Sequence, residues 1–249
     1  IDRDGLEKLT VTGNTITVTM RFAAFRNRPE GGNVVNEAEL LVRSEENWCL
    51  YNEECLRSYG LEIVYDENGN IQYAVSGDNQ YTVQFDVSIE VFESEDSPEF
   101  REFIKSEEFT GIYLFGDCNI DGEDICISEM ESPGLTKSLS DESISEYKNK
   151  EAIVFKDLES MSKTVEVHEG GHTLGLSHFG VNNMGTKKIQ GYKDLIHGTR
   201  WCSGNEDNSD PCYDSEGMMK YGGVENSPQT MKGTQVLNII NSTNGAKSE

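Results

Sequence analysis

The stretch TVEVHEGGHTLGLSHFG, residues 164–180, constrains the fold of this chain more than any other. Only four histidines occur in 249 residues, and three of them lie within eleven positions here: His168, His172 and His178. Positions i and i+4 of a helix share one face, so the first two imidazoles can bind one cation. Gly175 tolerates a positive φ, which would end the helix, turn the chain and let the third histidine approach the same cation.

We expect a helix over residues 160–174, with Ser160 or Ser162 as its N-cap. Glu169 follows the first histidine and is rotated by about 100° from it, so it need not bind the cation. Its carboxylate can instead reach a water molecule held there. Three neutral imidazoles with an open fourth position are typical of a catalytic zinc site, because structural sites close all four positions. The pattern therefore predicts zinc held by three histidines beside a carboxylate available for proton transfer.

The spacing H-E-x-x-H-x-x-G-x-x-H resembles the signature of the metzincin clan of zinc endopeptidases, in which a Met-turn follows later in the chain. Met219, in GMMKYGG, is our candidate for this turn, with Tyr221 two residues after it. Met184, in VNNMGT, is the alternative, but no tyrosine follows it closely. The Met-x-Tyr pair is similar to the astacin, serralysin and pappalysin branches. The cysteine-bearing C-terminal region and the MMKY turn look most like the pappalysin group.

This resemblance implies an α+β fold with a twisted mixed sheet, a long active-site helix and an irregular C-terminal part that ends in a helix. Residues 1–249 would form a single metallopeptidase domain, with an N-terminal subdomain of about 1–178 and a C-terminal subdomain of about 179–249. From the residues themselves we expect strands and helices in the same mixed order. Hydrophobic patterns and turn residues predict strands over 15–25, 81–92, 110–115 and 151–155, a hairpin around Asn68-Gly69, helices over 34–46 and 98–106, and a C-terminal helix opened by Ser227-Pro228.

The resemblance also implies a mechanism. Zinc would lower the pKa of a bound water to about 7, and Glu169 would accept the proton as the water attacks a peptide bond. Tyr221 would help to stabilise the oxyanion; its alternative role is a core aromatic with a satisfied hydroxyl. In related enzymes the substrate lies extended and pairs with an edge strand, for which residues 110–115 are one candidate.

The six cysteines fall into three close pairs, and the local pairing is the natural one among the fifteen that six cysteines permit. No pair has the C-x-x-C spacing of a cysteine zinc site. Three local disulfides would indicate an oxidising compartment, so we expect a secreted or extracellular protein, with the periplasm or the cell surface as alternatives. Six buried free thiols are the other reading. The predicted pairs are Cys49–Cys55, Cys118–Cys126 and Cys202–Cys212.

The formal net charge of −24 argues against a nucleic acid or an anionic membrane surface as partner. The charge fits solubility or adaptation to a salty or calcium-rich medium, and an acidic cleft for basic substrates is the sharper alternative. We find no apolar run long enough for a membrane span. We also expect a monomer. The chain begins at Ile1, without an initiator methionine, which indicates a mature or trimmed form.

Two signals are weaker. The stretch DCNIDGEDICIS matches the first half of a calcium-binding EF-hand loop through Asp117, Asn119 and Asp121, but its twelfth position is Ser128 instead of glutamate. A polar turn closed by a disulfide is the alternative to calcium. Gly170 stands where the clan usually has a larger apolar residue, so the helix either packs unusually close to its sheet there or is locally softer.

Two functions remain in competition. The first is a secreted, zinc-dependent endopeptidase in which Glu169 is the general base. The second is a zinc-binding adhesion or recognition domain of the same fold without turnover. An intact Glu169 favours the enzyme, because a purely structural zinc site has no need of it.

Overall fold

The structure is a computed structural model, which describes residues 9–27, 36–52, 56–59, 62–65, 67–68, 71–75, 80–106, 109–120, 123–129, 133–139, 150–174, 230–232 and 239. The chain divides into two compact units. The terminal unit comprises Ile1–Val18, Glu53–Gln84 and Leu174–Glu249, and the central unit comprises Thr19–Asn52 and Phe85–Thr173. Both are described separately below.

The central unit is built on a mixed sheet with the strand order β10-β11-β7-β2-β6. β11 runs parallel to β7, and β7 runs parallel to β2. β10 is antiparallel to β11 and stands at the end of this order. The strands are β2 (Thr15–Phe25), β6 (Gln80–Phe92), β7 (Phe109–Phe115), β10 (Gly134–Leu139) and β11 (Lys150–Phe155), of which β2 and β6 begin in the terminal unit.

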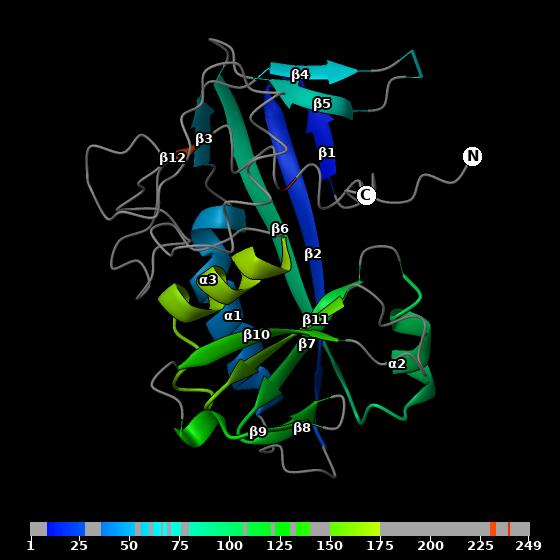
Figure 1. The fold of residues 1–249 in the computed structure, drawn as a ribbon, viewed down its shortest axis with the longest axis vertical. Coiled ribbons are helices and arrows are strands. Elements are labelled where there is room, and N and C mark those ends of the chain that lie inside the picture. The colour runs from blue at the N-terminus through cyan, green and yellow to red at the C-terminus, as the bar shows by residue number, and fades with distance from the viewer. Residues whose placement is uncertain are drawn as a thin grey trace. The chain divides into compact units, whose positions relative to one another are not determined.

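Helices cover both faces of this sheet. Figure 1 shows α1 and α3 on one side of β10 and β7, and α2 on the other. A short hairpin of β8 and β9 and the 3-10 turn η1 complete the unit. The bounds are α1 (Glu37–Asn52), α2 (Pro98–Phe103), β8 (Cys118–Ile120), β9 (Glu123–Ile125), η1 (Ile127–Glu129) and α3 (Lys163–Thr173). None of the helices that the structure describes is long and apolar enough to span a membrane.

Burial follows from this layering. Strand β7 lies inside the sheet and is covered on both faces, so all seven of its residues are buried. On the α2 side, aromatic rings pack edge to face, as between Phe25 and Phe100, whose centroids are 4.9 Å apart. At the Phe109 ring of the same core, Lys150 lies 5.3 Å from the ring centroid and donates to the Phe109 carbonyl.

Each helix of the central unit begins at a polar residue, as capping requires. The Asn36 side chain accepts from the N–H of Glu39 at the start of α1. Ser97 accepts from the N–H of Phe100 at the start of α2, where Pro98 occupies the first turn. Before α3, the carbonyl of Ser162 accepts from the N–H of Glu166 at 2.8 Å. Of the two caps predicted for this last helix, Ser162 holds the position.

The terminal unit contains short strands. β1 (Leu9–Thr12) pairs antiparallel with the start of β2, and β3 (Leu56–Tyr59) pairs antiparallel with the start of β6. β4 (Glu62–Tyr65) and β5 (Ile71–Val75) form the hairpin predicted around Asn68-Gly69. β12 (Thr230–Lys232) runs parallel to β3.

Most predicted elements are confirmed, and the fold is mixed α+β as expected. Two predictions are wrong. Residues 110–115 form β7, which has a neighbour on each side. Among the strands that the structure describes, the order ends instead at β10, where no strand was predicted. The C-terminal helix does not begin at Ser227-Pro228, because Thr230–Lys232 pairs with β3 as a strand; Ile239, further on, is helical and buried. The division near residue 178 stays a prediction.

Candidate active site

Helix α3 presents two opposite faces to its surroundings. A helix turns by about 100° per residue, so residues four apart share a face. His168 and His172 form one face of α3. Glu166 and Gly170 form the opposite face, which packs against α1.

The two histidines of the first face lie close together, one helical turn apart. Their ring centroids are 4.9 Å apart and the rings are nearly perpendicular, at 88°. His168 is 7% exposed, and His172 is half-buried. Two imidazoles on adjacent turns of one helix face are the arrangement that the sequence spacing predicted.

Glu169 lies on the flank of α3 that faces β10. Its side chain is 7% exposed, and the hydroxyl of Thr136 donates to Oε2 at 2.5 Å. The same hydroxyl lies 3.1 Å from the carbonyl oxygen of Glu169. Burial raises the pKa of the Glu169 carboxyl, while the Thr136 hydrogen bond and the charge of His172 act in the opposite direction. The carboxyl is therefore both oriented and more basic than an exposed glutamate.

Close approach between α3 and β10 depends on Gly134. A β-carbon added there would lie 2.6 Å from Cγ1 of Val165 and 3.3 Å from Cγ of Glu169. Real β-carbons essentially never come as close as 2.6 Å, so any other residue here would force the Val165 side chain to shift. Gly134 and Thr136 are two apart on one strand and therefore share a face. Together they place Glu169 directly against the edge strand.

The opposite face of α3 carries a buried carboxylate that the sequence did not predict as functional. Glu166 is fully buried and accepts hydrogen bonds from four side chains. The donors are Ser44 Oγ at 2.5 Å, Asn47 Nδ2 at 2.7 Å, Trp48 Nε1 at 3.0 Å and Tyr113 OH at 3.0 Å. Three of these donors belong to α1 and one to β7, so Glu166 joins α3 to both elements.

Burial and these hydrogen bonds shift the pKa values of Glu166 and Tyr113. Burial raises the pKa of Glu166, and the hydrogen bonds from its four donors oppose the rise. Burial, followed by the neighbouring Glu166 carboxylate, raises the pKa of Tyr113 well above its ordinary value. The available sequence signal was the placement of Glu166 between Val165 and Val167, opposite the histidines on the helical wheel.

Several predicted site residues lie outside the described residues. These include the third metal ligand His178, the turn residue Gly175, and Met219, Met184 and Tyr221 of the C-terminal region. Within the part of the chain that the structure describes, no three His, Cys, Asp or Glu side chains form a group able to hold a metal. His168 and His172 nevertheless fit a zinc site, because their imidazoles share one helix face beside a buried carboxylate.

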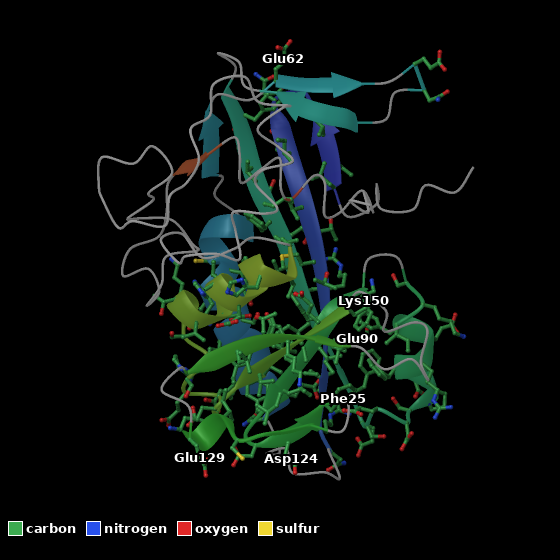
Figure 2. The ribbon with its side chains drawn as sticks, viewed as in Figure 1. Phe25, Glu62, Glu90, Asp124, Glu129 and Lys150 are labelled. Carbon is green, nitrogen blue, oxygen red and sulfur yellow. The ribbon has the colours of Figure 1, made fainter. Side chains whose placement is uncertain are left out.

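The predicted calcium loop coincides with the β8–β9 hairpin. Asp117 is exposed and Asn119 is paired with Asp124 in the register of the two strands, while Asp121 lies outside the described residues. Figure 2 shows Asp124 and Glu129 at the same end of this unit. Calcium binding stays a prediction.

Two cysteines of the predicted disulfides are described as free and exposed, Cys49 in α1 and Cys126 just after β9. In the hairpin, Cys118 is paired with Ile125, one residue before Cys126. The three disulfides stay a prediction. Cys55, Cys202 and Cys212 lie outside the described residues.

No protein-family model, curated protein or solved structure matches this chain. Its function is therefore inferred from the residues of α3 and of β10 themselves.

Proposed function

We propose that this protein is a zinc-dependent endopeptidase of the metzincin type, which hydrolyses peptide bonds in extended segments of protein or peptide substrates. The observation that carries the proposal is the arrangement around Glu169. Its buried carboxylate lies between the two imidazoles of α3 in sequence and against the edge strand β10 in space. A carboxylate at this position has a role in proton transfer and none in a purely structural metal site.

The zinc ligands would be His168, His172 and His178. The first two fit this role through their common helix face. When bound, zinc supplies Lewis-acid polarisation of the scissile carbonyl and lowers the pKa of a water molecule to about 7. Glu169 takes the proton of the attacking water and returns it to the leaving amine. Tyr221 would donate to the developing oxyanion, and Met219 would lie beneath the site as an apolar floor.

Strand β10 is the part of the sheet that could align a substrate. It pairs with β11 along one side, and within the described residues no strand pairs with its other side. An extended peptide can add to such an edge through main-chain hydrogen bonds. Because β10 also contacts Glu169 through Thr136, a peptide bound along this edge would pass close to the general base.

The proposal has three further parts, of which the resemblance supports the first and the cysteines support the second. They are the pappalysin-like branch, secretion with three disulfides, and a monomeric state.

The test compares zinc content and peptidase activity in the unmodified protein and in Glu169→Ala. A diverse peptide library serves as substrate, and Glu159→Ala, which removes an exposed carboxylate, is the matched control. We expect zinc binding in all three proteins and a loss of cleavage of at least about 1,000-fold only in Glu169→Ala. Full activity of Glu169→Ala with zinc bound would contradict the mechanism. An unmodified protein that binds one zinc and cleaves no library member would favour the recognition domain.

A further inference from the structure

The contact between Thr136 and Glu169 connects two elements that the proposed function uses for different purposes. Glu169 belongs to the zinc-binding helix, and Thr136 belongs to the edge strand. Their hydrogen bond is 2.5 Å long and joins residues 33 positions apart. Hydrogen bonds to a carboxylate are about twice as strong as bonds between neutral groups, so this one can hold the side chain in a single orientation.

A second observation supports a built arrangement. Gly134, on the same face of β10, provides the space that α3 needs to bring Glu169 within reach of the hydroxyl. On the other face of the strand, Leu135 and Leu139 pack into the hydrophobic core on the α2 side. The core thus fixes β10 from one face while Gly134 and Thr136 meet α3 on the other.

We propose that Thr136 is a positioning residue that fixes the carboxylate of Glu169 for proton transfer, so that the strand aligning the substrate also sets the place of the base. The inference rests on the proposed function. Thr136 itself transfers no proton in this scheme; its hydroxyl donates to Oε2 and limits the rotation of the carboxylate. A rotation away from the attacking water reduces the rate without changing substrate affinity.

The first experiment measures kcat, KM and zinc content for Thr136→Val and Thr136→Ser. Valine keeps the shape and removes the hydroxyl, serine keeps the hydroxyl, and Thr10→Val in the exposed part of β1 is the control. We expect valine to lower kcat about 10- to 100-fold with KM within about twofold and zinc content unchanged. Serine should restore kcat to within about fivefold of the unmodified protein.

Three results would overturn the inference: an unchanged kcat in Thr136→Val, a serine variant as impaired as the valine variant, or a loss of activity that merely follows a loss of zinc. In each case the unmodified protein still cleaves peptides, so the proposed function survives. The two failures are therefore distinguishable.

A second experiment does not depend on activity. Urea unfolding is measured in the metal-free form of the unmodified protein, of Thr136→Val, of Glu169→Ala and of the double variant. This double-mutant cycle gives the coupling of the two side chains. We expect Thr136→Val to raise the unfolding constant about tenfold when Glu169 is present and less than about twofold when it is absent. Equal effects in both backgrounds would show that the two side chains are not coupled, which would contradict the inference. Coupling without any peptidase activity would leave Thr136 as a structural partner only and would reject its role in catalysis.

Discussion

A β-carbon added to Gly170 of α3 would lie 2.8 Å from Cζ2 of Trp48 in α1 and 3.0 Å from Cη2 of the same ring. The glycine is therefore needed for close packing of the two helices. The sequence led us to expect close packing against the sheet or a softer helix, and the closest contact is instead with α1. Trp48 also donates to Glu166, one turn earlier on the same face of α3. One indole ring thus contacts both Glu166 and Gly170 of α3.

We predict that Gly170→Ala destabilises the protein. Alanine gains about 1 kcal/mol of helix propensity, but the contacts with a buried ring cost about 1–3 kcal/mol of overpacking, and the second effect should win. Urea unfolding at pH 7 measures the difference. In a Trp48→Phe background, where the ring is smaller, the same substitution should be neutral or stabilising. An equal loss in both backgrounds would show that the ring is not the cause.

The four donors around Glu166 predict a graded loss of stability. Glu166→Ala leaves them without their acceptor and opens a cavity, which should cost about 3–5 kcal/mol. Glu166→Gln keeps the volume but replaces one acceptor oxygen by a donor, at a cost of about 1–3 kcal/mol. The exposed Glu159→Gln is the control and should stay within about 0.5 kcal/mol. Chemical denaturation measures all three, and a Glu166→Gln variant as stable as the control would speak against the network.

Tyr113 should resist ionisation at alkaline pH. Burial, followed by the Glu166 carboxylate, raises its pKa well above 10.0 in the folded protein. The unfolded chain releases this proton near pH 10, so the contribution of Tyr113 to stability is fully present below that pH and is lost as the pH rises further. Absorbance of tyrosinate at about 295 nm, compared between the unmodified protein and Tyr113→Phe, measures this. Identical titrations of the folded proteins are expected until alkaline unfolding begins; an earlier difference would contradict the prediction.

Zinc should stabilise the folded chain through the histidines of α3. A ligand that binds only the folded state adds about 2.7 kcal/mol at a free concentration of about 100 times its Kd. We therefore expect added zinc to raise the thermal midpoint of the metal-stripped protein and a chelator to reverse the rise. His172→Ala should lose most of the effect, and His197→Ala, outside the motif, should keep it. Equal responses of the two variants would place the metal elsewhere.

The sequence predicted those features that depend on contacts within one short segment. Helix α3 was predicted from its sequence pattern. The common face of its two histidines follows from helical periodicity, because residues four positions apart lie on the same face. Strands β2, β6, β7 and β11 follow from hydrophobic runs bounded by turns. By contrast, β10 has the sequence GLTKSL, whose weak alternation of apolar and polar residues does not predict a strand.

What the sequence determined by itself is the chemistry of α3: two imidazoles and a carboxylate at fixed angles around one helix. Only the tertiary structure decided what surrounds them. Strand order made β10 the edge and brought Thr136 to Glu169, and the packing of α1 brought Ser44, 122 positions away, to Glu166. Helical periodicity is local and needs no knowledge of the rest of the chain. Contacts between distant segments depend instead on which elements pair and on where a missing side chain, as at Gly134 and Gly170, lets them approach.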